Sequence, residues 1–167
     1  MMTSSIKQFE YKIKTSHLEY IEEQKMISIL KRGVSGAKIY LLTEPGSDSS
    51  ILIILTVFEL PMLNLMLPNL LKPYTNTAFL EAKDLGFLLV YEYKFLFLIP
   101  KDEKALLNDL QGEFYPSIIS ITTKKLSDES FLSVSTLRNN EYEVDLTITT
   151  LIKKYTKVFV KIDLKSN

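Results

Sequence analysis

The sequence predicts an α/β fold, with α+β as the alternative, in which about four helices flank a mixed β-sheet built around a central apolar hairpin. Two observations predict it. Leu85–Pro100 holds two nearly continuous apolar, aromatic-rich runs, Phe87–Tyr91 and Phe95–Ile99, joined at Glu92-Tyr93-Lys94. Such runs are typical of strands buried on both faces. Helix and strand patterns alternate early in the chain and strands dominate the middle, which indicates a sheet covered by helices.

The first elements follow from capping and turn signals. Residues 1–15 read as a ragged start containing one alternating strand from Phe9. Ser16 and Glu19 have the spacing of a capping box, so we expect a helix that ends near the glycines at 33 and 36. A buried strand, Ala37–Thr43, follows, and the Gly, Pro and Ser content of residues 44–50 indicates a loop.

The middle of the chain reads as strand, helix, strand, hairpin and helix. The predicted elements before and after the hairpin are strand Ile51–Phe58, helix Leu60–Leu71 between two prolines, strand Thr77–Ala82 and helix Lys101–Leu110. The last part predicts strands at Ser117–Thr123, Phe131–Thr136 and Tyr142–Leu146, and a closing helix at Thr149–Phe159.

We expect a single domain over 1–167, with 1–15 and 163–167 frayed. No internal repeat, low-complexity tract or linker is apparent in the sequence.

Composition excludes several chemistries. The chain of 167 residues has 46% apolar and 24% charged residues, and its 20 Lys and Arg balance its 20 Asp and Glu. No global field therefore favours nucleic acid. There is no Cys and only one His, His17, so disulfides, thiolate chemistry and two-His metal sites are ruled out. We expect a cytoplasmic protein without cofactor or metal.

Ile51–Leu71 is apolar and long enough to span a bilayer. It contains Glu59 and the prolines Pro61 and Pro68, and a charge and two prolines near the centre of a span are costly in lipid. A buried strand followed by a short apolar helix is the better interpretation, and we expect no membrane segment.

No catalytic residue is predicted. His17 lies at an expected helix start with no partner set up by local spacing, so a surface or capping role is favoured. The paired carboxylates of the sequence fall on predicted surfaces and turns, where no apolar setting raises a pKa.

Ligand-binding candidates lie where predicted strands end. Thr43, Ser47 and Asp48 follow one strand, Asp84 lies in the turn before the hairpin, and Glu92 joins the two hairpin strands. Loops at the carboxyl ends of strands are common ligand sites in α/β proteins, although a plain solvated loop is the favoured interpretation of residues 44–50.

Interface candidates lie on the helix Leu60–Leu71. The apolar surface of this segment adds to that of the hairpin, and one core cannot easily hide both. We therefore expect a surface used for self-association that includes some of Met62, Leu63, Met66 and Leu67. A fully internal helix is the alternative.

Short motifs resemble the phospholipase D superfamily. Leu30-Lys-Arg-Gly-Val followed by Ala37-Lys-Ile-Tyr-Leu-Leu-Thr is similar to the start of one half of that fold, and Leu137-Arg-Asn-Asn-Glu-Tyr-Glu-Val is similar to its Asn-x-Glu strand. The family's His-x-Lys-x-x-x-x-Asp motif would place its residues on Leu85, Phe87 and Glu92. The resemblance therefore implies a catalytically dead copy, as in the sensor domains of archaeal TrmB-type regulators.

Three functions stay open. The first is a non-catalytic interaction or regulatory domain that self-associates or docks a protein partner. The second is a small-ligand sensor with its pocket at the strand ends. The third is an enzyme of a kind that the motifs do not reveal.

Overall fold

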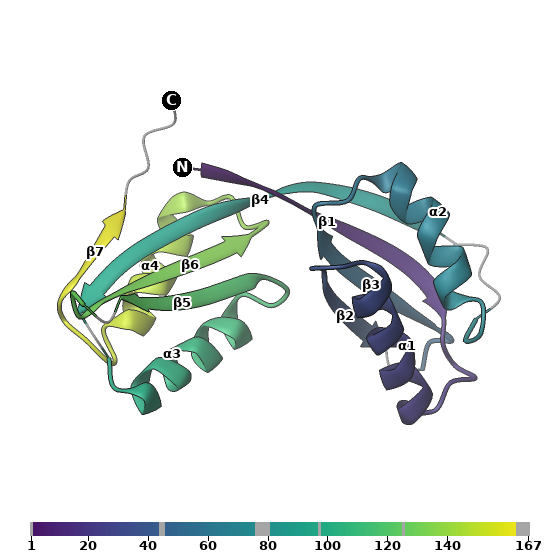
Figure 1. The fold of residues 1–167 in the computed structure, drawn as a ribbon, viewed down its shortest axis with the longest axis horizontal. Helices are drawn as coiled ribbons and strands as arrows, with labels where there is room; N and C mark the ends of the chain where they lie inside the picture. Colours follow the sequence, from purple (N-terminus) through teal and green to yellow (C-terminus); the bar gives the residue numbers. More distant parts are fainter. Residues whose placement is uncertain (1, 44–45, 76–80, 97, 125, 163–167) are drawn as a thin grey trace. The chain divides into compact units, whose positions relative to one another are not determined.

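The computed structural model describes residues 2–43, 46–75, 81–96, 98–124 and 126–162. Its contacts fall into two compact units. We call Ser5–Phe87 the first unit and Leu88–Asn167 with Met1–Ser4 the second unit. From the sequence we expected one domain and did not separate these units. Figure 1 labels their helices and strands.

The first unit contains a four-stranded sheet and two helices. Its elements are β1 (Met2–Lys14), α1 (Tyr20–Gly33), β2 (Lys38–Thr43), β3 (Ser49–Thr56), α2 (Leu60–Leu71) and the beginning of β4 (Glu81–Leu96). The strand order is β2-β3-β1-β4, and β3 runs antiparallel to both β1 and β2.

The second unit repeats this pattern, starting from the later part of β4. The elements that follow are α3 (Pro100–Glu113), β5 (Ile118–Lys124), β6 (Glu129–Thr136), α4 (Glu141–Ile152) and β7 (Phe159–Ile162). The strand order is β7-β4-β6-β5, with all three pairs antiparallel. Each unit is thus a βαββαβ, or ferredoxin-like, motif, and β4 serves both as the last strand of one and the first strand of the other.

In each unit both helices pack on one face of the sheet. In the first unit, alternate residues of β1 meet residues at helical spacing on α1 and α2. The fully buried members are Phe9, Tyr11, Ile13, Met26, Leu30, Leu63, Leu67 and Leu71. The second unit buries the corresponding set, which is Tyr91, Tyr93, Phe95, Leu106, Leu110, Val144, Ile148 and Ile152.

The correspondence extends to the sequence. Residues 9–13 read Phe-Glu-Tyr-Lys-Ile and residues 91–95 read Tyr-Glu-Tyr-Lys-Phe. The segment Ser-Asp-Ser-Ser at 47–50 corresponds to Ser-Asp-Glu-Ser at 127–130, and Leu-Leu-Lys-Pro-Tyr-Thr at 70–75 corresponds to Leu-Ile-Lys-Lys-Tyr-Thr at 151–156. The chain therefore contains an internal repeat of about 80 residues, contrary to our expectation from the sequence.

Side-chain hydrogen bonds are repeated as well. Ser50 Oγ donates to Thr43 Oγ1 at 3.2 Å, and the Ser130 and Thr123 hydroxyls are 3.0 Å apart. Both pairs join neighbouring strands at the same register position, so the loops between these strands are held in the same way in each unit.

The predicted α/β fold class is confirmed, because the described residues form a β-sheet with four helices packed on it. The central hairpin is wrong, because Glu81–Leu96 is one continuous strand. Glu92 and Lys94 alternate with buried Tyr91, Tyr93 and Phe95, so they form no turn. Leu96, which belongs to the second of the two expected buried runs, is 53% exposed.

The predictions for residues 142–148 and 153–159 are also wrong. Tyr142–Leu146 is not a strand but part of α4, which begins after Asn140, whose Oδ1 accepts a hydrogen bond from Glu143 N–H at 3.2 Å. The helix ends at Ile152, so Thr149–Ile152 of the expected closing helix is helical, whereas Phe159 begins the strand β7.

The N-terminal residues are ordered rather than frayed, because Met2–Lys14 forms β1. Ser16 is not a helix cap, since α1 begins after Glu19, and Glu19 makes no side-chain capping bond. The predictions for residues 44–45, 77–80, Phe97 and 163–167 lie outside the described residues. Within the described part of the chain, no helix has the length and apolar character needed to cross a bilayer.

Candidate functional site

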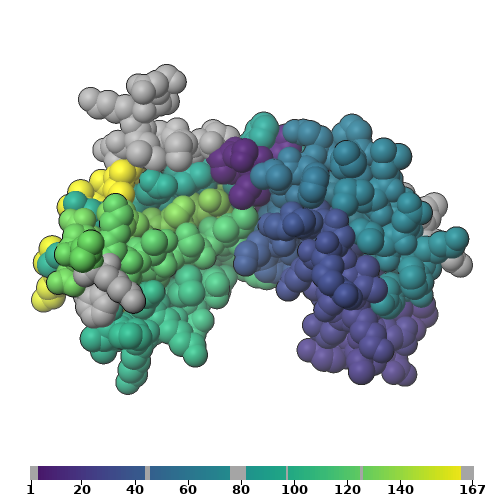
Figure 2. All heavy atoms as spheres, viewed as in Figure 1, coloured from purple at the N-terminus to yellow at the C-terminus, as the bar shows by residue number. Residues whose placement is uncertain are grey.

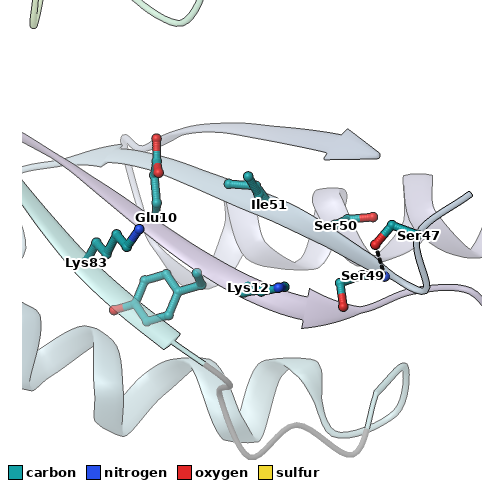
Figure 3. A pocket seen from close by; sticks show the side chains of 8 residues that line it. Glu10, Lys12, Ser47, Ser49, Ser50, Ile51 and Lys83 are labelled. Carbon is teal, nitrogen blue, oxygen red and sulfur yellow. Dashed lines mark hydrogen bonds between the residues drawn. The ribbon is translucent and has the colours of Figure 1, made fainter. Parts of the chain in front are cut away.

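A pocket of about 190 Å³ lies in the first unit, along β1, the start of β3 and the neighbouring part of β4. Figure 3 shows the side chains around it. It is lined by Glu10, Tyr11, Lys12, Ser47, Ser49, Ser50, Ile51 and Lys83.

Strand alternation places the charged residues on the sheet face opposite the helices. Phe9, Tyr11 and Ile13 are buried in the core shared with α1 and α2. Glu10 and Lys12 therefore point to the other face, because successive side chains of a strand point to opposite sides. Ile51 of β3 is paired with Lys12 of β1, so its side chain lies on the same face of the sheet.

Hydroxyl groups form the end of the pocket where β3 begins. Ser49 N–H donates to Ser47 Oγ at 3.2 Å, and Ser49 Oγ donates to Asp48 Oδ1 at 3.2 Å. The carbonyl of Asp48 accepts from Thr15 N–H at 3.1 Å. These bonds hold the loop against the end of β1, which is a rigid setting for polar groups.

The pocket is lined by charged groups of both signs. The ammonium groups of Lys12 and Lys83 lie there with the carboxylate of Glu10. Lys12 is exposed, and its ammonium group makes no ion pair with any described residue. A positively charged group without a counter-ion, beside hydroxyl donors, is suited to an anionic group of a small ligand.

The equivalent place in the second unit is different. Glu92 and Lys94 occupy the strand positions of Glu10 and Lys12, and Glu129 occupies that of Ser49. Lys94 Nζ lies 3.4 Å from Glu129 Oε1. The second lysine thus has an ion-pair partner, whereas the first has none in the described part of the chain.

The structure brings together three of the five predicted ligand residues. Ser47 lines the pocket, Asp48 is its neighbour, and Thr43 bonds to Ser50. Asp84 lies apart from them in an ion pair with Lys7 at 3.3 Å, and Glu92 belongs to the second unit. Sequence reasoning missed Glu10, Lys12 and Lys83, which an alternating strand pattern presents as ordinary surface charges. The repeated Glu-Tyr-Lys was the available signal.

Buried tyrosines link each sheet to its second helix. Tyr11 hydroxyl donates to Asn64 Oδ1 at 3.2 Å, and Tyr93 hydroxyl donates to Asp145 Oδ1. Burial, with a smaller contribution from Asp84, raises the pKa of Tyr11 to about 12. Burial and then the bond to Asp145 raise the pKa of Tyr93. Both hydroxyls stay protonated at neutral pH and act as fixed donors.

The predicted interface residues divide into two groups. Leu63 and Leu67 are fully buried and belong to the core, so they are not surface residues. Met66 is partly buried and packs against the same core. Met62 is 48% exposed and its neighbour Leu65 is 72% exposed. Figure 2 shows α2 at the surface of the first unit.

His17 is exposed, and its Nε2 lies 2.6 Å from the carbonyl oxygen of Tyr74, to which it donates in the matching tautomer. This contact joins the turn before α1 to the turn after α2. Among the described residues, no group of three or more His, Asp or Glu side chains is arranged to hold a metal ion.

Comparisons with known proteins report only distant similarity. No protein-family model matches the chain, and no curated protein matches its sequence. A microcompartments protein from Desulfitobacterium hafniense DCB is 8% identical, with 95% of this chain and 94% of that chain covered and a TM-score of 0.33.

Two aspartate kinases also align. The Clostridium acetobutylicum enzyme is 16% identical over 93% of this chain, with a TM-score of 0.34, and E. coli aspartokinase III is 13% identical over 91%, with a TM-score of 0.31. This chain covers 35% and 32% of those two chains, about a third of each. Similarity at this level carries no functional argument. The phospholipase D-like resemblance remains an expectation.

Proposed function

We propose that this chain is a non-catalytic regulatory domain that binds a small anionic or zwitterionic ligand in the pocket of the first unit. The observation that carries the proposal is Lys12, a cation held on a rigid strand beside Ser47 and Ser49 without an ion-pair partner among the described residues. A group of this kind gains a favourable interaction when an anion arrives and leaves no internal ion pair to be broken.

The absence of catalysis is part of the proposal. The pocket contains hydroxyls, ammonium groups and one carboxylate. Of its lining residues, Tyr11 has a raised pKa, but its hydroxyl points to the helix side of the sheet and bonds to Asn64. None of the lining hydroxyls has a His within its bonding network, so no lining side chain is set up as an activated nucleophile.

A ligand screen tests the proposal. We would titrate the chain with panels of amino acids, dicarboxylates, nucleoside monophosphates and inorganic phosphate, and follow binding by calorimetry. We expect at least one class to bind, and Lys12→Ala to abolish that binding. Lys94→Ala is the matched control, because it removes the same residue from the same strand position of the second unit. Binding that survives Lys12→Ala, or no binding by any class, would overturn the proposal.

Self-association through α2 is the second candidate. It is favoured by the exposure of Met62 and Leu65 on the surface of this helix. Changing both to Glu should convert a dimer into a folded monomer in sedimentation experiments, whereas Leu63→Glu should unfold the chain because Leu63 is core. A parent chain that is already monomeric at high concentration ends this candidate.

A further inference from the structure

The internal repeat allows the pocket of the first unit to be compared with its own counterpart. Lys12 is paired with Ile51 across the sheet, and Lys94 is paired with Phe131 in the same way. One pair further along, Ser49 faces Lys14, and Glu129 faces Leu96. The two lysines, and the residues diagonal to them, therefore occupy equivalent backbone positions.

The decisive difference is the residue diagonal to the lysine. In the second unit this residue is Glu129, whose carboxylate lies 3.4 Å from Lys94 Nζ. In the first unit it is Ser49, which is too short to reach Lys12 and whose hydroxyl bonds to Asp48 instead. The strand position that carries a carboxylate beside Lys94 thus carries a hydroxyl group beside Lys12.

We infer that the first unit's pocket takes a small carboxylate-bearing metabolite, whose carboxylate lies beside Lys12 where Glu129 lies beside Lys94, and that Glu129 keeps the second unit's counterpart occupied. This inference rests on the proposed function and names its ligand class. The chain supplies its own carboxylate at one of two equivalent places and leaves the other for a ligand.

The pocket favours a carboxylate over a phosphate. Of the residues that line it, none is Arg and none lies at a helix N-terminus, the two features most suited to phosphate. Glu10 lies on the same face as Lys12, where it repels a phosphate dianion and suits a ligand that also carries an ammonium group. L-Glutamate carries a carboxylate and an ammonium group, and its side chain is the same as that of Glu129. It is therefore the probe of choice.

Ser49→Glu and Ser49→Gln form a matched pair of variants. Ser49→Glu recreates the second unit's arrangement and should place a carboxylate beside Lys12, which NMR of lysine ammonium groups detects as slowed hydrogen exchange. It should weaken L-glutamate binding about tenfold or more. Ser49→Gln has the same size without the charge and should weaken binding much less. Equal losses in both variants, with both folded by circular dichroism, would show steric blocking and overturn the inference.

The ligand class is tested on the unaltered chain with L-glutamate and inorganic phosphate. L-Glutamate binding that depends on Lys12, with weaker or no phosphate binding, supports the inference. Binding of phosphate alone overturns the carboxylate assignment but leaves the proposed function standing. If neither probe nor any panel class binds, the proposed function fails. NMR of the lysine ammonium groups in Ser49→Glu then still tests whether Lys12 and Lys94 occupy equivalent positions. If Lys12 forms no ion pair with the new carboxylate in that variant, the positions are not equivalent.

Discussion

Lys94 Nζ lies 3.4 Å from the Glu129 carboxylate on the sheet face of the second unit that faces away from its helices. Both side chains are partly exposed, so the pair itself adds little stability. Its importance is that Lys12, at the equivalent strand position, makes no such ion pair with the residues that the structure describes. We therefore expect Lys94→Ala and Glu129→Gln each to change the free energy of unfolding by no more than about 1 kcal/mol, as measured by urea denaturation. A larger loss would give this pair a structural role that its exposure does not predict.

The buried hydrogen bonds of the two tyrosines should differ in strength. Tyr93→Phe removes a bond to the carboxylate of Asp145 and should cost about 1.5–3 kcal/mol. Tyr11→Phe removes a bond to the neutral amide of Asn64 and should cost about 0.5–1.5 kcal/mol. Tyr20→Phe is the control, because Tyr20 is exposed. Urea denaturation gives the three values, and the reverse order for Tyr93 and Tyr11 would contradict the structure.

The same tyrosines predict a loss of stability at alkaline pH. The pKa of Tyr11 is raised to about 12 in the folded chain, against about 10 when unfolded. Between these values the unfolded chain has lost the proton and the folded chain keeps it, so stability falls as pH rises, by up to about 1.4 kcal/mol per pH unit for each such group. Tyr11→Phe should flatten the decline in urea melts between about pH 10 and about pH 12. An unchanged slope would show that Tyr11 titrates normally.

The two faces of α2 should respond differently to truncation. Leu67→Ala leaves a cavity in the core of the first unit and should cost about 2–5 kcal/mol. Leu65→Ala removes an exposed side chain from the same helix and should change stability by no more than about 0.5 kcal/mol. Comparable losses at the two positions would place Leu65 in a contact that the structure does not show.

Most helices and strands whose hydrophobic residues follow one clear period were predictable from the sequence. The helix Leu60–Leu71 and the strand at Ile51 have a single hydrophobic pattern with prolines or a loop at their ends, and the structure has α2 and β3 there. Residues 141–146 failed because Glu-Tyr-Glu-Val-Asp-Leu alternates over a stretch too short to exclude a helix. The buried residues Val144, Ile148 and Ile152 show the helical spacing only over a longer window.

The site was harder to predict than the fold. Glu92 and Lys94 looked like a turn because they interrupt an apolar run, although in a strand they occupy the outward positions between Tyr91, Tyr93 and Phe95. Glu10 and Lys12 carry no signal by themselves, since charges at alternate positions are normal for a half-exposed strand. Only their recurrence 82 residues later, at Glu92 and Lys94, sets them apart.

The most direct test of the account is to locate the bound ligand by NMR. With isotope-labelled chain and L-glutamate, we predict one ligand per chain and amide shift changes centred on residues 10–12, 47–51 and 83, with no matching changes at 92–94 and 127–131. Changes at both sets of residues, or only at the second set, would contradict the claim that the first unit holds the open site.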